Sequence, residues 1–136
     1  MITAVDTNVL IDVFGADPEF GEGSREALRD CLAHGGLIAC EVVWAEVAAA
    51  FPSVVAAQEA LRRLGVGFSS IAESAALAAG TALAGHRRAG GARSRVIADF
   101  LIGAHAAGAA DRLLTRDRGF YRRYFESLEV LGPSSA

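Results

Sequence analysis

Lysine is absent from this sequence, in which all 13 basic residues are arginine. This absence argues against haloacid-dehalogenase-type phosphatases and response-regulator receivers, which typically hold phosphate with a lysine. Those phosphatases also need a second aspartate two residues after their nucleophile, and Asn8 stands at that distance from Asp6. A P-loop is missing too, and Thr7 and Asn8 occupy positions where a Rossmann dinucleotide site has glycines.

Cysteines and long apolar runs are equally scarce. Cys31 and Cys40 lie in apolar surroundings without CxxC spacing, so we expect two small core residues in a reducing compartment. No run of about 18 strongly apolar residues predicts a membrane span, and no signal-peptide pattern occurs at the start. We therefore expect a soluble, cytoplasmic protein with one domain over 1–136, long enough to bury a single core.

The charge is unevenly distributed along the chain. The net charge of −3 alone argues against a nucleic-acid partner, but nine arginines and only three aspartates lie between residues 87 and 123. This stretch forms a basic face that is a candidate for contacts with nucleic-acid phosphate, with ordinary solvated helix surface as the alternative. The candidate contact residues are Arg87, Arg88, Arg93, Arg95, Arg116 and Arg118.

Short apolar runs alternate with helical segments. Strands are predicted at 2–5, 37–40, 66–68, 112–114 and 128–131, and helices at 8–14, 24–33, 41–51, 53–64, 70–88, 96–110 and 119–125. Ser24 is the expected N-cap of the second helix, and Ser70 with Glu73 forms a predicted capping box. Strands separated by helices predict an α/β fold, a three-layer α/β/α sandwich with a mainly parallel central sheet.

Four acids interrupt apolar structure in this pattern. Asp6 follows the first predicted strand and Asp117 the fourth, so both belong at the carboxyl edge of the sheet, where open α/β folds place their chemistry. Glu46 and Asp99 lie within apolar helices. An ionised acid buried there without a partner costs several kcal/mol, so each must reach water, a cation or a metal.

If these four acids converge, their charges call for a cation. Two carboxylates about 4 Å apart repel by about 4 kcal/mol at an effective dielectric near 20. Carboxylates without accompanying histidine or thiolate favour hard cations, so Mg²⁺ or Mn²⁺ is expected rather than zinc. His34, His86 and His105 show no ligand spacing and are expected to be ordinary surface or core residues. Hard metals on an acidic cluster serve phosphoryl chemistry.

Four segments resemble the motifs of PIN domains, in the order and spacing of VapC-type toxin ribonucleases: AVDTNVLIDVF, VVWAEV, RSRVIADFLIGAHA and RLLTRDRGFYRRYF. The resemblance implies that the acids named above form the metal site and that Asn8 and Thr115 orient the carboxylates or a water. It also implies metal-dependent cleavage of RNA by a homodimer that a cognate antitoxin inhibits. Glu41 departs from the pattern, because many relatives have a small hydroxyl residue there. A catalytically inactive PIN-like module that binds nucleic acid or protein is the alternative.

Two segments of the sequence are candidate surfaces for binding partners. Helices rich in alanine and glycine, at 72–88 and 96–110, bury little area each, so pairing of two copies would add burial. The apolar helix at 41–51 carries Trp44 and Phe51, which are either part of the groove in which relatives bind an antitoxin helix or plain core.

Overall fold

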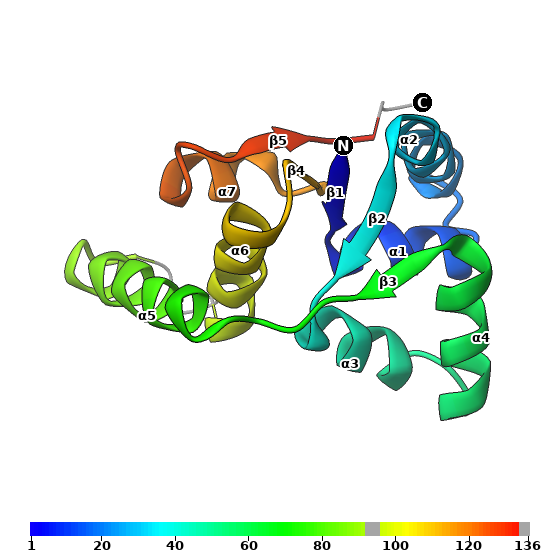
Figure 1. Ribbon diagram of the computed structural model, residues 1–136, viewed down its shortest axis with the longest axis horizontal. Coiled ribbons are helices and arrows are strands. Elements are labelled where there is room, and N and C mark those ends of the chain that lie inside the picture. Colours follow the sequence, from blue (N-terminus) through cyan, green and yellow to red (C-terminus); the bar gives the residue numbers. More distant parts are fainter. Residues whose placement is uncertain (92–95, 134–136) are drawn as a thin grey trace.

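The sheet of this protein has five strands that all run parallel (Figure 1). The computed structural model describes residues 1–91 and 96–133. The strands are β1 (Ile2–Val5), β2 (Gly36–Ala39), β3 (Val66–Phe68), β4 (Arg112–Leu114) and β5 (Glu129–Leu131). Their order across the sheet is β3-β2-β1-β4-β5, which places β1 in the centre and confirms the predicted α/β fold.

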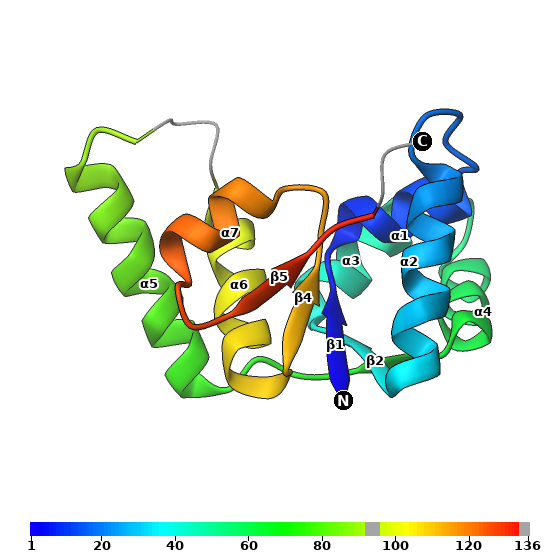
Figure 2. The same cartoon turned by 90° about the horizontal axis from the view of Figure 1, so that it is seen from above.

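Seven described helices connect the strands and cover both faces of the sheet. They are α1 (Thr7–Phe14), α2 (Gly21–His34), α3 (Glu41–Ala49), α4 (Val54–Leu64), α5 (Glu73–Arg88), α6 (Ile97–Ala109) and α7 (Arg118–Tyr124). Figure 2 shows α5, α6 and α7 on one side of the strands and α1, α2 and α4 on the other. Helix α3 contacts α1, α4 and α6, so it links the two layers.

The pairing of β1 with β4 brings the two ends of the sequence together. Val5 lies opposite Leu114, and the Asp6 N–H donates to the Leu114 carbonyl at 2.9 Å. Because both strands are parallel, the residues that follow them, Asp6 and Thr115, emerge side by side at the carboxyl edge. Parallel pairing therefore builds one site from residues more than 100 positions apart.

The core lies between the sheet and the two helical layers. Cys31 and Cys40 are both buried and free, as predicted. Trp44 and Phe51 are partly buried and pack against the core, and Phe51 also lines a surface pocket beside Phe14. No helix in the described ranges is long and apolar enough to cross a membrane.

The start of α2 corrects the sequence prediction. The helix begins at Gly21, where the sequence predicted a loop, because the Asp17 carboxylate accepts from the Glu19 and Phe20 N–H groups at 3.0 and 2.7 Å and turns the chain early. Ser24 is therefore not an N-cap. Its side chain is buried inside the helix and donates to Asp12 at 3.0 Å.

The predicted capping box at the start of α5 is also wrong. The helix begins at Glu73 with no side-chain cap, and the Ser70 hydroxyl donates instead to Glu41 at 2.8 Å. The other Glu41 oxygen accepts from the Ile71 N–H at 2.7 Å. This carboxylate thus fixes the segment that leaves β3 to the first turn of α3, a competing partner that the local pattern cannot reveal.

Candidate functional site

Asp6 is the buried centre of the candidate site. It is the N-cap of α1, and its Oδ1 accepts from the Thr7 N–H at 2.8 Å. Its Oδ2 accepts from the Thr115 hydroxyl at 2.7 Å and from the Asn8 amide at 3.4 Å. Only 6% of the residue is exposed, and these donors are all neutral. The carboxylate is therefore held firmly without having its charge cancelled by them.

Thr115 connects Asp6 to the next acid of the site. Its side chain is fully buried, and while its hydroxyl donates to Asp6, the same oxygen accepts from the Asp117 N–H at 2.9 Å. Asp117 is the residue before α7 and is partly exposed. Asn8 adds a second link across this edge, since its Oδ1 accepts from the Arg116 N–H at 3.2 Å. One hydroxyl and one amide thus join the turn after β4 to the start of α1.

The remaining two acids reach the same edge from the helices. Glu46, on the exposed side of α3, accepts from the Thr7 hydroxyl at 2.7 Å, one residue from Asp6. Asp99 lies in the first turn of α6, a helix that packs on both β1 and β4, and its charge acts on Asp6. Acids from four separate segments therefore lie near the carboxyl edge of β1.

Burial dominates the electrostatics of this edge. It raises the pKa of the Asp6 carboxyl above its ordinary value, and this effect outweighs the hydrogen bonds from Thr115 and Thr7, which favour the charged form. The neighbouring charge of Asp99 raises this pKa further. A buried carboxylate with a raised pKa at the mouth of a sheet marks a candidate functional position.

A second buried aspartate lies at the other end of α1, and its charge is paired. Asp12 is 3% exposed and accepts from Arg116 Nε at 2.7 Å and Nη2 at 3.1 Å, as well as from Ser24. The Arg116 guanidinium also stacks over the Phe20 ring at 4.1 Å. Such a bidentate pair is strong and directional. Arg116, a candidate for RNA contact, is thus held within the fold.

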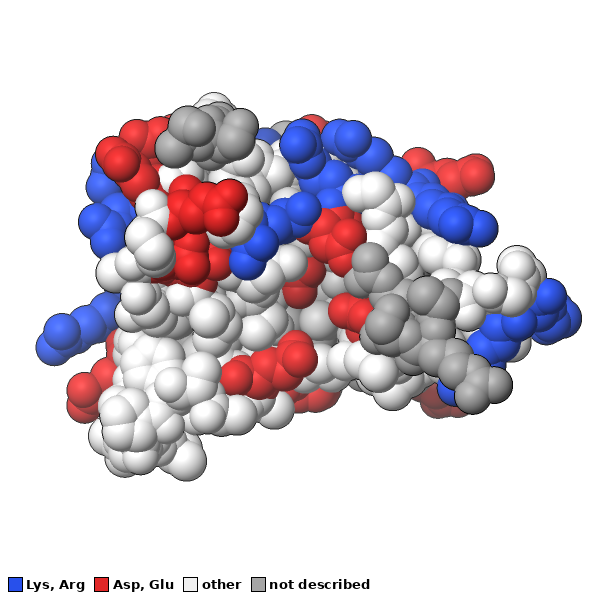
Figure 3. Space-filling view, turned by 180° about the vertical axis from the view of Figure 1, so that it is seen from behind, with Lys and Arg blue, Asp and Glu red and all other residues white. Residues whose placement is uncertain are grey.

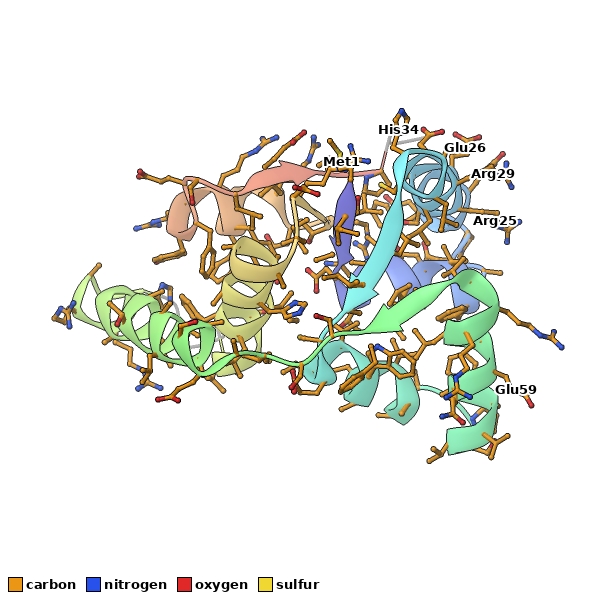
Figure 4. All side chains as sticks on the ribbon, in the orientation of Figure 1. Met1, Arg25, Glu26, Arg29, His34 and Glu59 are labelled. Atoms are coloured by element: carbon orange, nitrogen blue, oxygen red, sulfur yellow. The ribbon has the colours of Figure 1, made fainter. Side chains whose placement is uncertain are left out.

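The other candidate arginines differ in position. Arg87 and Arg88 are exposed in the last turn of α5, and Arg118 is exposed at the start of α7. Arg93 and Arg95 lie outside the described residues. Figure 3, which looks on the back of Figure 1, shows acidic side chains near the centre of this face and basic side chains above them. Arg25, Glu26 and Arg29 lie on a different part of the surface and point outward from α2 (Figure 4).

Sequence reasoning missed three residues of this region. Thr7 holds Glu46, Asp12 pairs with Arg116, and Tyr121 lies buried beside the acids. Asp12 could have been found, because it interrupts an apolar helix just as Glu46 and Asp99 do. Among the described residues, no three His, Cys, Asp or Glu side chains converge closely enough to form a complete metal-binding group.

The sequence matches a known family. The PIN domain family model matches residues 3–126, and the chain therefore belongs to the PIN domain family. No curated protein matches the sequence.

Solved structures share the fold at low sequence identity. VapBC2 from Rickettsia felis, bound to a promoter DNA fragment, has a TM-score of 0.76 at 17% identity, covering 98% of this chain and 100% of the other. A toxin-antitoxin complex from Klebsiella pneumoniae has a TM-score of 0.67 at 21% identity, covering 98% and 99%. FitAcB from Neisseria gonorrhoeae has a TM-score of 0.67 at 19% identity, covering 96% of each chain.

Proposed function

We propose that this protein is a metal-dependent endoribonuclease that acts in the cytoplasm as the toxin of a toxin-antitoxin pair. The observation that carries the proposal is Asp6: a buried carboxylate at the end of the central strand, with a raised pKa, near acids from three other segments. Membership of the PIN domain family supports the nuclease class. The similar structures include toxin-antitoxin complexes, which supports the biological role.

The oxygen donors are of the kind that Mg²⁺ or Mn²⁺ prefers, and these side chains would have to close on the cation, since no three of them converge in the described part of the structure. The oxygen atoms of carboxylates suit hard divalent cations, and the neutral hydrogen-bond donors to Asp6 leave a charge that a cation would balance. Asp6 and Asp99 would hold the cation, with Asp117 and Glu46 bound directly or through water. Thr115 and Asn8 would keep the carboxylates oriented, as the outer partners of metal ligands do.

The chemistry would be hydrolysis of an RNA phosphodiester. A bound divalent cation acidifies an attacking water and stabilises the charge that develops on the phosphate. Asp117 or Glu46, which are less buried than Asp6, would take the proton of the attacking water. Asp6 is tied by three donors, so its role is to hold charge in place rather than to move protons.

The deciding experiment measures cleavage of structured RNA by the purified chain with Mn²⁺, with Mg²⁺ and with a chelator. We expect cleavage with either metal and none with the chelator. Cleavage that persists in the chelator would contradict the metal role. Binding of RNA with no cleavage under any condition would favour the inactive binding module.

RNA binding would rest on the exposed arginines. Changing Arg87 and Arg88 to Ala together should weaken binding to all RNA sequences alike and flatten the salt dependence by about one to two units of slope, because phosphate contacts release counterions. The matched control is the double change of Arg25 and Arg29 to Ala, on the outer side of α2 (Figure 4), which alters the net charge equally. If both double variants weaken binding equally, Arg87 and Arg88 act through the net charge of the protein and not through direct phosphate contacts.

The antitoxin and a second copy of this chain are the proposed partners. The toxin role is tested by co-expression with the neighbouring reading frame, which should relieve growth arrest and co-purify. Sedimentation at micromolar concentration tests the homodimer, and a clean monomer would refute it. Each result is independent of the nuclease chemistry, so the enzyme and its assembly can be judged separately.

A further inference from the structure

Tyr121 presents a buried polar group that the fold itself does not explain. It lies on α7, one turn after Asp117, and 0% of the residue is exposed. Within the described ranges, its hydroxyl has no hydrogen-bond partner of normal geometry. Buried hydroxyls are nearly always paired, because an unpaired one loses its bonds to water without compensation. We therefore expect this hydroxyl to have a role that offsets the cost of burying it.

The surroundings of the hydroxyl are acidic. The charges of Asp6, Asp99 and Asp117 all raise the pKa of the Tyr121 phenol, and the charge of Asp6 has the largest effect of the three. Burial first, and then these charges, hold the pKa of the phenol far above its ordinary value. A phenol O–H can donate a hydrogen bond to a carboxylate oxygen, which accepts it.

The neighbouring Tyr124 provides a contrast on the same helix. Its hydroxyl bonds to His86, and its ring packs in an aromatic cluster with Phe100 and Phe120. The ring of Tyr121 also packs against Phe120, with centroids 5.0 Å apart. Ring packing alone would be served by phenylalanine at position 121, so the buried hydroxyl is the part that requires another role.

We propose that Tyr121 is a positioning residue of the acidic site, whose hydroxyl donates to the Asp6 carboxylate and fixes it for cation binding. The inference rests on the proposed function. Each carboxylate oxygen can accept two hydrogen bonds, and Asp6 Oδ1 has one protein donor of normal geometry, the Thr7 N–H. Capacity for a further donor therefore remains. Together with Thr115, Tyr121 would hold Asp6 from β4 and α7 at once.

The test is Tyr121→Phe, which removes the hydroxyl and keeps the ring. Mn²⁺ affinity is measured on the RNA-free protein by the electron paramagnetic resonance signal of the bound ion. We expect the affinity to fall about tenfold or more, the effect typical of residues that orient metal ligands. The matched control, Tyr124→Phe, removes a hydroxyl that points to His86 and should leave the affinity unchanged.

Thermal unfolding in a chelator separates positioning from structure. Tyr121→Phe should unfold close to the wild-type temperature there, because the ring keeps its packing against Phe120 and the lost hydrogen bond is offset by the loss of a buried hydroxyl. Lower stability in the chelator with unchanged Mn²⁺ affinity would overturn the inference and make the hydroxyl structural. If the wild type binds Mn²⁺ and Tyr121→Phe binds it equally, only the role of Tyr121 fails. If the wild type binds no more Mn²⁺ than Asp6→Asn, the metal site fails and this inference fails with it.

Discussion

Two aspartates at opposite ends of α1 are equally buried but differ in their partners. Asp6 and Asp12 are 6% and 3% exposed. Asp12 is bound by a guanidinium through two nitrogens, whereas the donors to Asp6 are a backbone amide, a hydroxyl and a side-chain amide. The charge of Asp12 is balanced by Arg116 within the fold, whereas the hydrogen-bond donors to Asp6 are neutral and leave its charge in place. The nature of the partner, rather than the depth of burial, therefore distinguishes the acid paired within the fold from the acid that we propose binds the cation.

The largest expected effect is on RNA cleavage when Asp6 is changed. Asp6→Asn should lower the cleavage rate by more than roughly 100-fold, which is the upper cost of losing a residue that only orients a metal ligand. The fold should survive, because asparagine has the same shape. Asp12→Asn serves as the comparison, and its folded fraction should retain the activity. Cleavage rates with Mn²⁺, normalised to the folded fraction by circular dichroism, provide the measurement. An active Asp6→Asn variant would remove the difference between the two aspartates.

The second largest expected effect is a loss of stability when Asp12 loses its partner Arg116. Arg116→Ala leaves Asp12 buried without its cation and should cost about 2–4 kcal/mol, less than a fully buried pair because the Arg116 side chain is 33% exposed. Adding Asp12→Asn to this variant should recover part of the loss, since it removes the unpaired charge. Urea unfolding measures both. Arg29→Ala, an exposed change on α2, is the control and should cost little. A loss no larger than that of the control would show that the pair contributes nothing.

The smallest effect concerns pH in the absence of metal. Because burial raises the pKa of Asp6 above 3.8, the folded state holds this proton more tightly than the unfolded state. The stability that Asp6 contributes is therefore fully present below pH 3.8 and is lost as the pH rises through its folded pKa. Unfolding in a chelator at a series of falling pH values should show wild type gaining stability relative to Asp6→Asn, and the gain should begin above pH 3.8. A pH-independent difference would mean that the Asp6 charge is already compensated.

The sequence allowed the large features to be predicted. Five strands and their parallel pairing follow from short apolar runs separated by helices, and the position of Asp6 and Asp117 at the ends of strands follows from the same pattern. The starts of α2 and α5 could not be predicted, because Ser24 and Ser70 prefer distant carboxylates over local caps. The pairing of Arg116 with Asp12 was hidden for the same reason, as 104 residues separate them.

The bond between Thr115 and Asp6 joins residues 109 positions apart. During synthesis, a nascent chain therefore exposes Asp6 long before its partner leaves the ribosome, and β1 must wait for β4 before the centre of the sheet can close. Fragments that end before β4 lack both the hydroxyl and Asp117. Under the proposed function, premature termination, or cleavage by a protease ahead of Arg112, should thus yield pieces without nuclease activity.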